Sequence, residues 1–152
     1  MESHCASCGM EVARGEQGCQ ELFTQLGVRA FKGYLYARFH RMTVDAYALQ
    51  HPARYCASAK SLMAHLGGLC CTFDYADEPR VHAALLRSLN GKPALEKPEL
   101  PVSRGALTIA EALRAPDAPS YGEHVERWAR CVWKAYEDLH PFARGWIQKA
   151  LG

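Results

Sequence analysis

Hydrophobic residues recur at intervals of three and four positions along most of the chain, which is the spacing of one face of an α-helix. The spacing predicts helices over residues 17–26, 34–50, 58–69 and 79–90, and later helices that begin near Thr108, Ser120 and His140. No segment shows a comparable alternation of apolar and polar residues, which is the pattern of a half-buried strand. The fold class is therefore expected to be all-α, a compact helical bundle.

Turn-forming residues predict where several helices end. Pro52 cannot continue a helix, because it lacks a backbone N–H and its ring clashes with the preceding turn. Asn90 and Gly91 form a stop signal for the helix before them. Gly67 and Gly68 lie near the end of the 58–69 helix and are expected to weaken its last turn.

Two pairs of residues match the capping box, in which a helix-starting hydroxyl and a glutamate three residues later satisfy free backbone N–H groups. The pairs are Thr108 with Glu111 and Ser120 with Glu123. Both glutamates are assigned to capping. They are not assigned to catalysis.

The domain organisation is expected to be a single helical domain over residues 1–152. Residues 1–16 are irregular, and residues 1–20 form an N-terminal metal-binding knuckle. Residues 91–105 contain three prolines and two glycines, which indicates a crossing loop between helices and need not divide domains.

Composition fits a globular protein, with 49% apolar and 22% charged residues. The apolar runs are too short to span a membrane and the N-terminus lacks the features of a secretory signal, so a cytoplasmic location is expected. The net charge of +2 argues against nucleic acid as a partner. The densest basic group is Arg29, Lys32, Arg38 and Arg41, and a nucleic-acid module built on it remains the weakest alternative.

The most specific chemical signal is the C-x-x-C-G of Cys5, Cys8 and Gly9. Two thiolates at this spacing can bind one zinc ion, and the glycine eases the turn that brings them together. The alternatives are two ordinary surface thiols and a redox pair, but a redox pair normally stands between a strand and a helix, and no strand is predicted before it. Zinc is therefore the expected cofactor.

A four-ligand zinc site needs two more side chains. Cys19 is the first candidate, since it is placed in the first turn of the 17–26 helix, where the helix dipole favours a thiolate. His40 and His51 lie about 16 Å apart along one helix at about 1.5 Å per residue, so both cannot bind the same ion. An antiparallel arrangement of the 17–26 and 34–50 helices places His51 beside Cys19, and His40 is the alternative.

The segments CASCG, CQELF, HRMTVDAYALQHP, SLMAHL and WARCVWKAYEDLHPFARGW carry a resemblance to a known family. Together they resemble an uncharacterised bacterial family, a domain of unknown function with an N-terminal C-x-x-C-G, a later cysteine and a T-V-x-x-Y-x-L-Q-H-P segment. Members commonly have proline where this chain has Ala6, a position that is not a ligand. The resemblance implies a shared fold and a metal site, and it implies no activity.

The sequence is compatible with two kinds of protein that differ in function. The first is a small zinc-binding protein that acts as a binding or regulatory module toward an unknown protein or small molecule. The second is a metal-dependent enzyme, similar to helical-bundle thiol transferases, whose catalytic ion is held by histidines such as His40, His65 and His140. A hydrogen-bonded core histidine is the simpler interpretation of each of these three residues.

Overall fold

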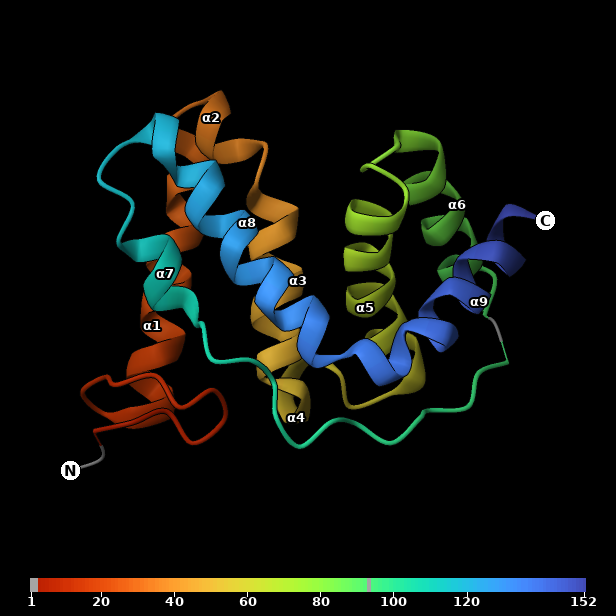
Figure 1. The fold of residues 1–152 in the computed structure, drawn as a ribbon, viewed down its shortest axis with the longest axis horizontal. Helices are drawn as coiled ribbons and strands as arrows, with labels where there is room; N and C mark the ends of the chain where they lie inside the picture. The colour runs from red at the N-terminus through yellow and green to blue at the C-terminus, as the bar shows by residue number, and fades with distance from the viewer. Residues whose placement is uncertain (1–2, 93) are drawn as a thin grey trace.

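The computed structural model describes residues 3–92 and 94–152, and these are mostly helical (Figure 1). The α-helices are α1 Gly15–Val28, α2 Tyr34–Ala37, α3 His40–Gln50, α4 Pro52–Tyr55, α5 Ala59–Asp74, α6 Pro79–Asn90, α7 Ile109–Leu113, α8 Ala118–Ala135 and α9 His140–Leu151. Two 3-10 segments are η1 Arg29–Lys32 and η2 Glu137–Leu139. In the described ranges the β structure is one isolated antiparallel bridge between His4 and Glu11, which confirms the all-α fold class.

Helices α3 and α8 pack against each other in the middle of the molecule (Figure 1). Helix α5 packs on α3 and α8, and it also contacts α6 and α9 on the side away from the N-terminus. Helices α1, α2 and α7 lie on the other side of the α3 and α8 pair (Figure 1). None of the helices in the described ranges combines the length and the apolar character needed to cross a bilayer.

The core forms where the apolar faces of α3, α5 and α8 meet. Trp128 and Val132 of α8 are fully buried, as are Tyr47 and Leu49 of α3 and Leu66 of α5. Burying an apolar side chain of this size stabilises a fold by about 1.5–3 kcal/mol. Trp128 of α8 is therefore part of the core.

The predicted 34–50 helix is interrupted in the structure. Helix α2 ends at Ala37 and α3 begins at His40, with Phe39 between them at φ −100° and ψ 2°. The ring of Phe39 lies against Gly122 of α8. The interruption therefore packs this aromatic side chain onto the central helix.

The prediction that Gly67 and Gly68 weaken a final turn is wrong, because α5 continues to Asp74. Both glycines are buried. A Cβ at Gly67 would lie 3.1 Å from Leu85, and the carboxylate of Asp45 occupies the space beside Gly68. The missing side chains let α6 and α3 approach α5, and this packing outweighs the low helix propensity of glycine.

The prediction of a capping box at Ser120 and Glu123 is also wrong. The N-cap of α8 is Asp117, whose carboxylate accepts a hydrogen bond from the Ser120 N–H at 2.9 Å. Pro119 stands in the first turn, where its missing N–H costs nothing. The cap lies three residues earlier than the sequence signal indicated.

Glu111 is buried and does not cap its helix, although Thr108 is the N-cap of α7 as predicted. The carboxylate pairs with Arg127 at 2.5 Å and with Arg114 at 2.9 Å, and His124 lies 3.3 Å away. The hydrogen bond from Arg127 and the nearby charge of Arg114 lower the pKa of Glu111, against the opposing effect of burial. Glu111 therefore joins α7 to α8 through charge.

Residues 94–107 cross one end of the bundle from α6 to α7 without regular structure (Figure 1). The side-chain amide of Gln50, in the last turn of α3, donates hydrogen bonds to the carbonyl groups of Arg104 at 3.0 Å and Leu107 at 2.7 Å. A loop as long as this carries many backbone groups that need partners. Gln50 supplies two of these partners from the core.

Candidate metal centre

Cys5, Cys8, Cys19 and His51 come together at the N-terminal end of the molecule. Their ligand atoms all lie within 4.8 Å of one another. Cys5 and Cys8 belong to the loop before α1, Cys19 belongs to α1, and His51 follows the last residue of α3. Within residues 3–92 and 94–152, this is the one cluster of three or more histidine, cysteine or acidic side chains that could hold a metal ion.

Three of the six donor separations are close to those of a tetrahedral zinc site. With Zn–S of about 2.3 Å and Zn–N of about 2.05 Å, a tetrahedron puts two sulfurs about 3.8 Å apart and sulfur about 3.6 Å from nitrogen. The Sγ atoms of Cys8 and Cys19 are 3.9 Å apart. The Nε2 atom of His51 lies 3.5 Å from the Sγ of Cys5 and 3.4 Å from that of Cys19.

The loop from Cys5 to Met10 is folded by its own backbone. The Cys5 N–H donates to the Met10 carbonyl and the Gly9 N–H donates to the Cys5 carbonyl, each at 2.8 Å. Gly9 has φ +81°, a conformation that glycine adopts without steric cost. Burial raises the pKa of Cys5, while the N–H groups of Cys8 and Ser7 oppose this by donating to its sulfur. The turn therefore directs backbone N–H groups toward the sulfur of Cys5.

Cys19 lies in the second turn of α1, because the helix begins at Gly15. The expected effect of the first-turn dipole therefore does not apply to it. Its pKa is held below the usual range mainly by the hydrogen bond from Cys8, against the opposing effect of burial, and the hydroxyl of Tyr47 lowers it further. The contact between the two sulfurs raises the pKa of Cys8, because they compete for one proton. Cys19 is thus the sulfur that the fold prepares most strongly as a thiolate.

His51 is oriented by the carbonyl group of Tyr47, which lies 2.7 Å from its Nδ1 atom. A carbonyl oxygen can only accept, so Nδ1 carries the proton and Nε2 has a free electron pair. Nε2 is the atom that faces Cys5 and Cys19. A metal-binding histidine is commonly fixed in this way by a hydrogen bond from its second nitrogen.

The structure brings His51 to the cluster and keeps His40 away from it. Helices α1 and α3 place the end of α3 beside Cys19, as the antiparallel arrangement predicts. His40 is the first residue of α3 and is exposed at its opposite end. It is therefore not placed to serve as the fourth ligand.

Tyr47 is the functional residue that the sequence reasoning missed. Its hydroxyl lies 3.2 Å from the Sγ of Cys19. Its ring stacks between Phe23 of α1 and His51, with ring centroids 3.9 Å apart on each side. The spacing of four residues between Tyr47 and His51 was the available signal, because such residues share one helix face.

The histidines of the alternative catalytic site do not converge. Nδ1 of His65 lies 3.0 Å from the carboxylate of Asp45. Nε2 of His140 lies 2.8 Å from the Trp133 carbonyl, and its ring stacks on that tryptophan. With His40 exposed elsewhere, each of the three histidines has a separate environment.

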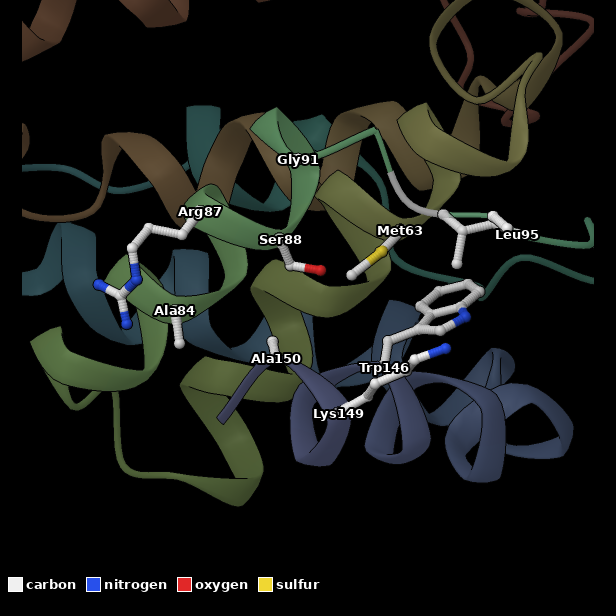
Figure 2. Close-up of a pocket in the computed structure, with 10 residues that line it drawn as sticks. Met63, Ala84, Arg87, Ser88, Gly91, Leu95, Trp146, Lys149 and Ala150 are labelled. Carbon is white, nitrogen blue, oxygen red and sulfur yellow. The ribbon is translucent and has the colours of Figure 1, made fainter. Parts of the chain in front are cut away.

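A pocket of about 400 Å³ lies between α5, α6 and α9 (Figure 2). Met63, Leu95 and Trp146 give it apolar walls. The side chains of Arg87 and Lys149 extend toward opposite ends of this pocket (Figure 2). The two charges therefore do not converge on one ligand group.

Residues 3–137 match the model of a protein family described as a family of unknown function, DUF5946. Comparison with curated proteins gave no match, and comparison with solved structures gave none. The matched residues include the complete cluster of three cysteines and one histidine and most of the helical core. The chain therefore belongs to the family of unknown function DUF5946.

Proposed function

We propose that the protein is a zinc-binding helical protein whose ion is held by Cys5, Cys8, Cys19 and His51. The observation that carries the proposal is that three of the six donor separations agree with the edges of a zinc tetrahedron. Three sulfurs and one imidazole are also the soft and borderline donors that zinc prefers.

The role of this ion is structural. Four protein side chains fill a tetrahedral shell and leave no position for a substrate or an activated water, which a catalytic zinc site keeps open. Cys5, Cys19 and His51 are buried, and Cys8 is half-buried. The ion therefore acts as a cross-link between the N-terminal loop, α1 and the end of α3.

A cross-link of this kind contributes to folding. Cys5 and His51 are 46 positions apart in sequence, so one ion joins segments that are distant along the chain. Because the unfolded chain has no preformed site, the binding free energy of the metal stabilises the folded state. We assign the protein a binding or regulatory role toward a partner that remains to be found. Reduced thiols suit a reducing compartment such as the cytoplasm.

The test is metal analysis of protein purified without added metal. We expect one equivalent of zinc in the wild type and a large loss in Cys5→Ser and His51→Ala. His65→Ala is the matched control, because His65 is also a partly buried, hydrogen-bonded histidine but lies outside the cluster. It should retain the zinc.

Two results would overturn the proposal. A wild-type protein that binds no divalent metal, even when refolded with zinc, excludes the site. Loss of metal only in His65→Ala would assign the ion to a site that contains His65. That result would favour the alternative function, a metal-dependent enzyme with histidine ligands. As a second readout, a chelator should increase amide exchange in residues 3–20 before it affects α5 and α9.

A further inference from the structure

The segment between α1 and α3 exposes a cluster of large apolar side chains. Val28, Phe31, Tyr34 and Leu35 are 52%, 91%, 73% and 42% exposed. They are four of the seven exposed large apolar side chains in the described ranges, although they fall within eight positions of the sequence. Single apolar residues are ordinary on a protein surface, whereas a cluster of them marks a surface that contacts another molecule.

This apolar surface is held in place by the helices beside it. Helix α2 lies at the end of the molecule away from the N-terminal loop (Figure 1). It contacts η1 and packs on α8, where the ring of Tyr36 meets the ring of Tyr121 at a centroid distance of 4.9 Å. Between η1 and α2, Gly33 has φ +151°, a conformation that residues with a side chain rarely adopt. The exposed side chains therefore project from an anchored segment.

Basic side chains accompany this apolar surface. Residues 22–44 contain no aspartate or glutamate, and their basic residues are Arg29, Lys32, Arg38 and Arg41. Lys32 and Arg38 are exposed, and neither forms an ion pair with another residue that the structure describes. Asp77 lies across a small hollow from Arg38 and Arg41. Even with this carboxylate counted, the surface keeps an excess of positive charge.

Arg38 is held among the aromatic side chains. Its guanidinium lies over the rings of Tyr34 and Phe39, 5.7 and 5.1 Å from the two centroids. Nucleic-acid bases stack on free aromatic faces. They suit this surface poorly, because Arg38 covers one face of Tyr34 and the side chains of Val28 and Leu35 are aliphatic. The combination suits a lipid headgroup layer, which apolar side chains enter while cations stay among its charges.

We propose that this surface binds a bilayer that contains anionic lipids. The side chains of Val28, Phe31 and Leu35 enter the headgroup region, and Lys32 and Arg38 contact lipid phosphates. Charge complementarity selects this partner, because the surface of an anionic membrane attracts clustered basic residues. A second copy of the chain is a poorer partner, since a two-fold contact would bring like charges together. The proposed zinc site lies near the other end of α1, so the two proposals are independent.

The test is co-sedimentation of the full-length protein, as purified, with lipid vesicles. We expect binding to vesicles of phosphatidylcholine mixed with phosphatidylglycerol, weakened by salt, and little binding to phosphatidylcholine alone. Lys32→Gln and Arg38→Gln should each weaken binding about fivefold, since one basic side chain near an anionic surface contributes about 1 kcal/mol. Phe31→Ser should weaken binding about tenfold, because it removes an apolar side chain that the membrane would bury.

Two control variants match these changes at other surfaces. Phe142→Ser removes an exposed phenylalanine of α9, and Lys60→Gln removes an exposed lysine of α5. Both should leave binding unchanged, and thermal unfolding checks that every variant is folded. Absence of binding to anionic vesicles, equal binding to both lipid compositions or equal losses in the controls overturns the proposal. Oligothymidylate binding that Phe31→Ser weakens, without vesicle binding, would assign the surface to nucleic acid instead.

Discussion

The side-chain oxygen of Gln50 accepts a hydrogen bond from the indole N–H of Trp128 at 2.9 Å, and both side chains are buried. The amide nitrogen of Gln50 donates to Arg104 and Leu107 at the same time. One amide group thus joins α3, α8 and the segment 94–107.

Replacing this amide should destabilise the whole fold. Gln50→Leu keeps the approximate volume but leaves two carbonyl groups and one indole N–H without partners. We expect a loss of about 3 kcal/mol in the free energy of unfolding, measured in urea, since an unsatisfied buried group costs about 1–3 kcal/mol. Gln148→Leu, on the exposed face of α9, is the control and should change stability little. Equal effects of both substitutions would contradict the role given to Gln50.

The hydroxyl of Tyr47 should strengthen zinc binding through Cys19. Tyr47→Phe removes the hydrogen bond to the sulfur and leaves the stacked ring in place. Groups that support metal ligands in this way change affinity by about 10–100-fold when they are removed. A competition titration with a zinc chelator measures the change.

Tyr55→Phe is the matched control for that experiment. Tyr55 lies in the same aromatic cluster, but its hydroxyl donates to Gln20 at 2.9 Å and not to a sulfur. Zinc affinity should be unaffected by this substitution. If both tyrosine variants lose affinity alike, the effect comes from packing and not from the hydroxyl of Tyr47.

Gly68 should tolerate no side chain. In Gly68→Ala the new Cβ would lie 2.2 Å from Oδ2 of Asp45, so α3 and α5 must move apart. Overpacking of this kind costs about 1–3 kcal/mol. In Gly145→Ala, within α9, the Cβ meets no atom within 4 Å, and alanine should stabilise that helix by about 0.5–1 kcal/mol. Thermal unfolding of the two variants should give shifts of opposite sign.

Glu111 should make stability depend on pH in the acid range. Arg127 and Arg114 lower its pKa in the folded state, so its contribution is complete above its unfolded pKa of about 4.3. The contribution is lost as the pH falls through the lower, folded-state pKa. The difference in melting temperature between wild type and Glu111→Gln should therefore be largest at neutral pH and shrink toward pH 3. Glu123→Gln, at an exposed position of α8, should show no such trend.

The class of the fold could be predicted because helical periodicity records which side chains are buried. Helix ends were predicted well where the residue itself restricts the backbone, as at Pro52 and Pro79. Helix ends were predicted poorly where packing against another helix determines the residue at which a helix ends. Helix α5 continues through Gly67 and Gly68 because of contacts with α3 and α6. These contacts cannot be predicted from the sequence of α5 itself.

In the candidate metal centre, too, local features could be predicted from the sequence and features set by helix packing could not. Cys5 and Cys8 could be identified from their spacing alone, because the turn between them is local. Cys19 and His51 needed an assumed antiparallel arrangement of two helices, and the structure has this arrangement. The spacing of Tyr47 from His51 indicated a shared helix face, but not the contact of its hydroxyl with Cys19, which depends on how α1 packs against α3.

Gln50 and His51 are consecutive residues with different partners. His51 faces the N-terminal cysteines, and Gln50 holds the segment that leads to the second half of the chain. A displacement at the end of α3 therefore acts on both regions through one peptide bond. The peptide bond between these two residues therefore fixes the position of the candidate metal centre relative to the segment 94–107.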